Sequence, residues 1–206
     1  ISKAVSQAQA KVEGFNFDAR KNLVEYDDVN NQQREIVYKL RRRILDSENL
    51  KEEVLEKLGH QIERTILIST QADTGKLDYE RIIVGLMDIV PFDDKSKEQI
   101  KERLKELGGE EEIKEFSKKI LSDIYKSRES QVGETVMRQV EKYAYLGSID
   151  HLWIDHLDHI EGLREGVRLR GYAQKDPLVE FKNEAYTLFE TLIDRVDEEI
   201  GHRLFR

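Results

Sequence analysis

The 206-residue sequence contains no cysteine and only two prolines. Without cysteine, disulfide frameworks, cysteine-ligated zinc and thiol catalysis are all excluded, and a reducing compartment is suggested. No apolar run approaches the roughly 18 to 20 residues that a membrane-spanning helix needs. We therefore expect a protein without membrane spans, in which few prolines interrupt the helices.

Charged residues make up 37% of the sequence and apolar residues 38%, with a formal net charge of −8. This balance favours amphipathic helices with one buried and one solvated face over a thick globular core. Overall acidity argues against general nucleic-acid binding, because phosphate contacts need a cationic surface. The composition predicts an elongated all-α protein, on which a local cationic patch is still allowed.

The first 45 residues form one continuous amphipathic pattern, with no proline and one glycine, Gly14. Apolar or small side chains recur at steps of three and four, which predicts one long helix. Gaps fall only at Asn22 and Gln33 in a stripe made of Val5, Ala8, Val12, Phe15, Ala19, Tyr26, Val29, Ile36 and Leu40. Such a helix extends roughly 65 Å, longer than a compact domain of this size is wide. We expect a strut with partners along its length.

Shorter helical segments follow over residues 46–130. The segment 48–72 has an apolar stripe at Leu50, Val54, Leu58, Ile62, Ile66 and Leu67. Breaks are predicted near Gly75, where a left-handed cap is available, at Pro91, and at Gly108–Gly109. The pattern indicates a small helical subdomain, whose many charges are expected to form solvated faces with i,i+4 pairs.

The last part of the chain predicts two helices joined by a short loop. The first has its stripe at Ile149, Leu152, Trp153, Leu157, Ile160, Leu163 and Val167, and the second at Phe181, Ala185, Leu188, Leu192, Val196 and Ile200. Gly171 can end the first helix, Asp176 can cap the second, and Pro177 suits its first turn. A short loop brings the helices back antiparallel, so the hairpin tip reads LRGYAQK.

The sequence offers little for catalysis. No G-x-x-x-x-G-K-[ST] phosphate loop occurs, and no serine nucleophile stands in a recognisable context. His151, Asp155 and His159 share a helical face, but the two histidines lie about 12 Å apart along the axis, too far to share one small metal ion without Asp155 and a ligand from elsewhere. We interpret His156 instead as a polar member of the packed stripe. Asp27 and Asp28 diverge by about 100° and do not converge on a substrate.

Two long stretches carry a family resemblance: AQAKVEGFNFDARKNLVEYDDVNNQQREIVY near the start, and LWIDHLDHIEGLREGVRLRGYAQKDPLVEFKNEAYTLF near the end. Both closely resemble the carboxy-terminal half of the SecA family, the ATP-driven motors of bacterial preprotein export. The resemblance is strong over roughly residues 1–45 and 130–206. In the middle of the chain, only the helical character of the sequence resembles the family. Because the chain also opens on Ile1 within a helical pattern, we expect a fragment of a longer protein.

The resemblance implies a helical scaffold domain over 1–45 and 131–206, which includes a two-helix finger at about 131–206, and a helical wing domain over 46–130. It implies that the scaffold helix packs on the family's nucleotide-binding and preprotein-binding domains. The polar residues that match this strut are Asn16, Arg20, Lys21, Asp27, Asp28 and Arg34. They are the candidates for interdomain contact.

In this family the finger meets the translocating preprotein at the cytoplasmic mouth of the SecYEG channel. The resemblance therefore implies that Tyr172 is the tip aromatic, beside Arg168, Arg170, Gln174 and Lys175. A tyrosine ring suits sequence-tolerant contact with a passing chain, and nearby cations suit anionic lipid heads. Peripheral association with the inner face of the plasma membrane, from the cytoplasm, is implied as well.

The family's Walker motifs and its carboxy-terminal zinc-binding cysteines do not occur in this sequence. The chain is therefore expected to be non-catalytic and to bind no cofactor or metal, whereas the parent motor uses ATP and Mg²⁺. Two other hypotheses are left open. One is a free-standing helical adaptor that dimerises through the apolar seam of the strut as a coiled coil. The other is a nucleic-acid binder acting through RKN, KLRRR and the finger tip, which the overall acidity of the chain opposes.

Overall fold

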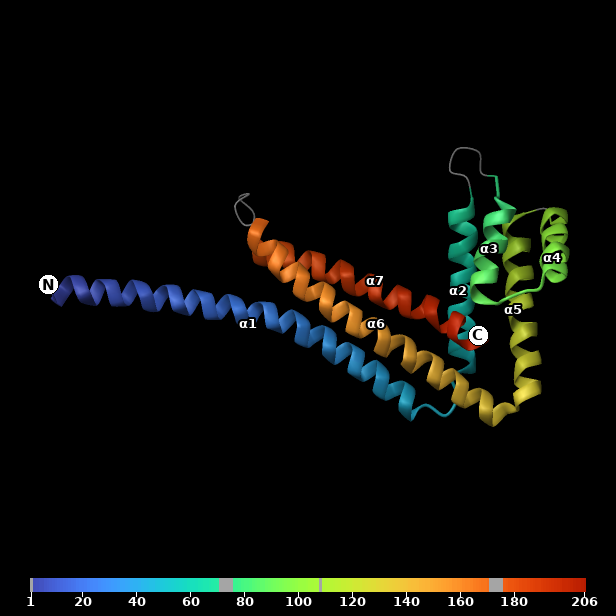
Figure 1. The fold of residues 1–206 in the computed structure, drawn as a ribbon, viewed down its shortest axis with the longest axis horizontal. Coiled ribbons are helices and arrows are strands. Elements are labelled where there is room, and N and C mark those ends of the chain that lie inside the picture. The colour runs from blue at the N-terminus through green and yellow to red at the C-terminus, as the bar shows by residue number, and fades with distance from the viewer. Residues whose placement is uncertain (1, 71–75, 108, 171–175) are drawn as a thin grey trace. The chain divides into compact units, whose positions relative to one another are not determined.

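A computed structural model describes residues 2–70, 76–107, 109–170 and 176–206, while the side chains of residues 18, 19 and 168–170 lie outside the description. The described residues form seven α-helices and no β-strand, although Thr70 and Leu77 form an isolated antiparallel bridge. The helices are α1 (Ser2–Asp46), α2 (Lys51–Ser69), α3 (Tyr79–Ile89), α4 (Asp94–Glu106), α5 (Glu110–Val132), α6 (Glu134–Arg170) and α7 (Pro177–Phe205). The predicted all-α class is confirmed (Figure 1).

The long helix predicted over residues 1–45 is confirmed as α1, a single helix of 45 residues. Contacts divide the chain into two compact units, and α1, α6 and α7 each contribute to both. Unit 1 comprises Ile1–Leu40 and Leu152–Leu192, and unit 2 comprises Arg41–His151 and Ile193–Arg206. The scaffold and wing domains predicted from the sequence were bounded by resemblance to the family, whereas the two units are defined by contacts. The predicted domain boundaries therefore stay a prediction.

Unit 1 contains the hairpin of α6 and α7, which run side by side and antiparallel in Figure 1. Its core is a buried cluster to which α6 contributes Ile160, Leu163 and Val167, and α7 contributes Phe181 and Ala185. Tyr26 of α1 meets Phe181 edge to face, with ring centroids 4.7 Å apart. Full burial of a phenylalanine side chain contributes about 1.5–3 kcal/mol to stability.

The start of α7 has the predicted cap. The backbone N–H of Leu178 donates to Asp176 Oδ1 at 2.9 Å, and Pro177 is the first helical residue. Proline is well placed here because its missing N–H would have no partner inside the helix. Gly171, where the preceding helix was expected to end, lies outside the described residues.

Gln33, one of the gaps in the predicted α1 stripe, is part of the unit 1 core with 7% of its surface exposed. Its Nε2 donates to the carbonyl oxygen of Ala185 at 3.0 Å, and its Oε1 lies 2.8 Å from Nε2 of His156. Because the amide nitrogen is committed to a carbonyl, Oε1 is the acceptor and His156 carries its proton on Nε2. The prediction that His156 belongs to the packed stripe is confirmed.

His156 is 4% exposed and packs against two aromatic rings. Its ring stacks on Trp153 at a centroid distance of 5.4 Å and meets Phe189 edge-on at 5.8 Å. Burial lowers the pKa of His156 to about 4, with a smaller contribution from His159. The imidazole is therefore neutral in the folded protein at ordinary pH.

In the part of α1 that packs in unit 1, the predicted stripe includes one residue on the wrong side of the helix. Ile36 is 51% exposed, and Val37 is buried in its place. An α-helix has 3.6 residues per turn, so its buried face drifts about 20° for every seven residues of a strict heptad. Tyr26 and Val37 are eleven residues apart, close to three whole turns, and so share the buried side.

Unit 2 contains α2, α3, α4 and α5, in which α2 packs on α3 and α5, and α3 packs on α4. Each of Leu50, Val54, Leu58, Ile62 and Ile66 in the predicted α2 stripe is buried, whereas Leu67 is 68% exposed and was wrongly included. The buried residues are spaced by four, and Leu67 falls about 100° away from this row. The predicted breaks at Pro91 and Gly109 separate α3 from α4 and α4 from α5. Gly75 and Gly108 lie outside the described residues.

A polar cluster joins α5 to α6 in the interior of unit 2. Glu141 has no exposed surface, and its Oε1 accepts a hydrogen bond from the hydroxyl of Tyr125. Arg138 donates to the same hydroxyl at 2.8 Å, pairs with Glu129, and lies 3.2 Å from Glu141. Burial raises the pKa of both Glu141 and Tyr125. The cluster fixes the two helices on either side of Gly133, whose φ is 85°.

Removal of the Tyr125 hydroxyl should destabilise the protein, because a buried carboxylate then loses its donor. We expect Tyr125→Phe to lower the free energy of unfolding by about 1–3 kcal/mol, measured by urea denaturation. The matched control is Tyr143→Phe on α6, whose side chain is 78% exposed. This control should change stability by less than about 0.5 kcal/mol. Equal effects of the two substitutions would contradict the assigned role of the cluster.

The buried neutral His156 should make stability depend on pH. Between about pH 6.5 and pH 4 the unfolded chain binds a proton at this imidazole while the folded chain does not, because its folded pKa is about 4. The free energy of unfolding should therefore fall by about 2 to 3 kcal/mol as pH is lowered through this window. Urea denaturation across the window should show a flatter profile for His156→Gln than for the parent chain. His60→Gln, at an exposed position, should keep the parent's profile, and an unchanged profile in His156→Gln would contradict the prediction.

Candidate functional site

The predicted interdomain residues all lie on the solvated surface of α1. Their side chains are exposed at Asn16, Arg20, Lys21, Asp27, Asp28 and Arg34. Along the helix they span about 27 Å, so they form an extended surface and not one convergent site. Asp27 lies 3.6 Å from Arg164 of α6, and Lys21 lies 4.0 Å from Glu25. Their contact with other domains stays a prediction.

The predicted finger tip falls mostly outside the described residues. This applies to Tyr172, Gln174 and Lys175, and to the side chains of Arg168 and Arg170. The flanking positions are described: Val167 near the end of α6 and Phe181 in the first turns of α7 belong to one buried cluster. The ends of the two helices that flank the tip are therefore held together.

The first half of α1 carries apolar side chains that nothing in the described chain covers. Val5, Val12 and Phe15 are 50%, 58% and 74% exposed, and we call these residues the exposed α1 stripe. They continue, at the same spacing, the row that Tyr26 and Val29 place against the buried cluster of unit 1. An apolar row that packs against a core in one half of a helix and is exposed in the other indicates an interaction surface. This surface agrees with the predicted strut with partners along its length.

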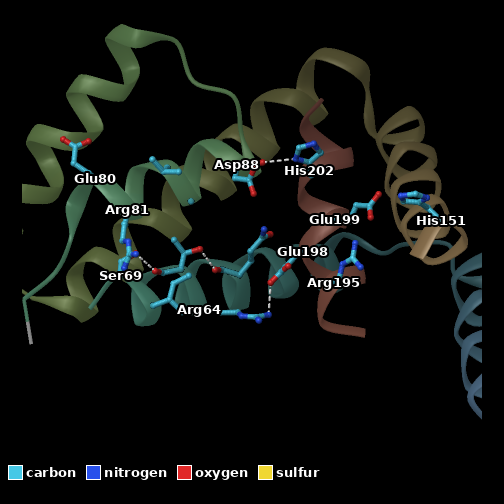
Figure 2. Close-up of a pocket in the computed structure, with 15 residues that line it drawn as sticks. Arg64, Ser69, Glu80, Arg81, Asp88, His151, Arg195, Glu198, Glu199 and His202 are labelled. Atoms are coloured by element: carbon cyan, nitrogen blue, oxygen red, sulfur yellow. Dashed lines mark hydrogen bonds and ion pairs between the residues drawn. The ribbon is translucent and has the colours of Figure 1, made fainter. Parts of the chain in front are cut away.

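A groove of about 910 Å³ in unit 2 was not expected from the sequence. It lies between α2, α3 and the last turns of α7, with His151 of α6 at its edge (Figure 2). We call it the α2–α3–α7 groove. Exposed Ile68 and Val84 line it together with several charged side chains. Sequence reasoning missed it because α7 is far along the chain from α2 and α3.

The polar groups of the α2–α3–α7 groove are not arranged for catalysis. The hydroxyls of Thr65 and Ser69 donate to the carbonyl oxygens of Gln61 and Thr65 within α2, at 2.9 and 2.7 Å. A hydroxyl used in this way is not activated by a base. His202 contacts the carbonyl oxygen of Asp88 through Nδ1 at 3.2 Å, as Figure 2 shows. The groove has the features of a binding surface.

Over residues 2–70, 76–107, 109–170 and 176–206, no group of three or more histidine, cysteine or acidic side chains is placed to hold a metal ion. In the same residues no helix is both long and apolar enough to span a bilayer. The row of His151, Asp155 and His159 is divided between the two units, and His159 Nδ1 lies 2.7 Å from the carbonyl oxygen of Asp155 in its own helix.

Comparison with known proteins gives one consistent result. A family model described as the SecA wing and scaffold domain matches residues 1–206. The chain is 38% identical to the protein translocase subunit SecA of Pelotomaculum thermopropionicum and 40% identical to that of Thermodesulfovibrio yellowstonii, and in both cases the whole chain is aligned. It spans only 23% and 22% of those two proteins, and no catalytic domain is matched. The chain thus belongs to the SecA wing and scaffold domain family.

Proposed function

We propose that this chain is the non-catalytic scaffold and finger region of a SecA protein translocase. In this role it couples the nucleotide-binding domains of the motor to the SecYEG channel and to the translocating preprotein. Support comes from the alignment of the whole chain with about a quarter of each translocase subunit. ATP and Mg²⁺ then belong to other parts of the motor, and this chain binds no cofactor of its own.

The observation that carries the proposal is the exposed α1 stripe. A helix of about 20 residues with exposed valine and phenylalanine side chains is only marginally stable on its own, because most helical stability in proteins comes from packing of an apolar face. We assign this surface to the nucleotide-binding and preprotein-binding domains of the motor. The neighbouring exposed polar residues of α1, such as Asn16 and Arg20, would supply hydrogen bonds at the edge of that contact.

The finger supplies the other end of the coupling. Tyr172 is proposed to touch the preprotein at the channel mouth, with Arg168, Arg170, Gln174 and Lys175 beside it. An aromatic ring gives apolar contact area without a sequence requirement, while its hydroxyl stays in water. The cations would face anionic lipid heads at the inner surface of the plasma membrane, where the motor associates peripherally from the cytoplasm.

Hydrogen exchange tests the assignment of the exposed α1 stripe. In the isolated 206-residue chain, amides of residues 2–24 should exchange rapidly, because this part of α1 has no tertiary cover. In the whole translocase subunit the same amides should be protected at least about tenfold more strongly. Phe15→Ser should reduce that protection, whereas Ile36→Ser, at an exposed position outside the stripe, should not.

Two results would contradict this assignment. Rapid exchange of residues 2–24 in the whole subunit would show that no domain of the motor covers them. A stable dimer of the isolated chain that Phe15→Ser dissociates, seen by analytical ultracentrifugation, would instead support the coiled-coil adaptor.

Substitution of Tyr172 tests the proposed role of the finger tip. In the whole subunit, Tyr172→Ala should reduce preprotein export into SecYEG vesicles by about tenfold or more, because the ring contact is lost. Tyr172→Phe should be tolerated, since the ring and not the hydroxyl makes the proposed contact. Unaltered export by Tyr172→Ala, with normal ATP hydrolysis, would show that the tip has a different role.

A further inference from the structure

Along the α2–α3–α7 groove, the acidic side chains have ion-pair partners among the described residues and two of the arginines do not. Each acidic side chain of the groove has a cationic partner in the chain: Glu80 with Lys101, Asp88 with Arg206 at 4.0 Å, Glu198 with Arg64 at 2.8 Å, and Glu199 with Arg203 at 2.6 Å. Each of these carboxylates therefore already has a cationic neighbour with which a basic ligand would compete. They offer little attraction to a basic partner.

Two arginines of the groove are in the opposite situation. Among the described residues, neither Arg81 of α3 nor Arg195 of α7 forms an ion pair, and both side chains are exposed. Figure 2 shows them at separate places along the groove. Each guanidinium keeps its planar set of donors available for a carboxylate. The two charged groups of the groove that lack an ion-pair partner in the described part of the chain are therefore positive, although the whole chain is acidic.

The same groove also offers apolar contact area. Ile68 of α2 is 66% exposed and Val84 of α3 is 64% exposed, and both line the groove. The hydroxyls of Thr65 and Ser69 already donate to carbonyl oxygens within α2. The strongest contacts that remain for a ligand are apolar packing on Ile68 and Val84 and ion pairs with the two arginines.

From this pattern we propose that the α2–α3–α7 groove docks an acidic amphipathic polypeptide segment. The segment places apolar side chains on Ile68 and Val84 and carboxylates on Arg81 and Arg195. This inference is independent of the proposed coupling through α1 and the finger. The volume of about 910 Å³ is large enough for several side chains of such a segment.

A membrane surface fits the same groove less well. The apolar residues and arginines line a concavity between helices, which a flat bilayer does not fill. An extended or helical peptide can enter such a concavity and place its carboxylates at the two arginines. The shape of the groove therefore favours a polypeptide.

Binding of designed peptides tests the proposal directly. The probe is a fluorescein-labelled peptide of about 14 residues made of Glu, Leu and Ala, with leucines at helical spacing. Its matched control replaces every Glu by Lys. By fluorescence anisotropy at low salt, the 206-residue chain should bind the acidic peptide at least about tenfold more tightly than the basic one.

Variants of the chain locate the binding surface. The double variant Arg81→Ala/Arg195→Ala should weaken binding of the acidic peptide about tenfold or more, and Val84→Ser should weaken it several-fold. Arg103→Ala, which removes an exposed arginine of α4 outside the groove, should leave binding unchanged. The substituted groove residues are exposed, so the variants should unfold at the parent's temperature, which circular dichroism checks.

Three results would overturn the proposal. The first is equal binding of the acidic and basic peptides, and the second is a double variant that binds the acidic peptide like the parent. The third uses vesicles of equal parts phosphatidylcholine and phosphatidylglycerol. If these vesicles sediment the chain only when Arg81 and Arg195 are present, while the acidic peptide does not bind, the groove faces lipid.

Discussion

The arrangement of unit 1 depends on one buried amide. Gln33 donates to the Ala185 carbonyl and accepts from His156, so a single side chain joins α1 to both helices of the hairpin. Apolar stripes alone tolerate small changes of register, because one aliphatic contact replaces another at little cost. If α1 moved by one turn, the buried polar groups would be left unpaired, at about 1–3 kcal/mol each. The contact of Tyr26 with Phe181 is therefore held at one register.

Local features of the fold were predictable because their causes are local. The absence of proline and the apolar spacing predicted a helix over residues 1–45, and α1 covers Ser2–Asp46. Asp176 and Pro177 start α7 through a cap and a first-turn proline, and both can be read without knowing what packs against the helix. Errors appeared where the exact direction of a side chain decides burial. Ile36 and Leu67 lie beside the buried row, and a pattern of threes and fours does not separate them from it.

Polar residues were harder to interpret than apolar ones. Gln33 interrupted the stripe of α1 and was therefore treated as a gap, although the structure buries it with two partners. The α2–α3–α7 groove was missed for a related reason. Whether Arg81 or Arg64 is paired depends on which acidic side chains tertiary packing brings near it, and Glu198 is far from both in the sequence. The number of charged residues can be read from a sequence, but whether each one has an ion-pair partner depends on the fold.

The two halves of α1 within unit 1 suggest how the proposed coupling would work physically. Residues near Val12 lack cover and are held in a helix mainly by continuity with the packed half. A domain that packs on them stabilises the helix and orients it. Because Gln33 joins the other half of α1 to α6 and α7, the proposed coupling would pass this orientation to the hairpin through direct contacts. In the proposed function, the buried amide of Gln33 would therefore connect the exposed α1 stripe to the two helices on either side of the proposed finger tip.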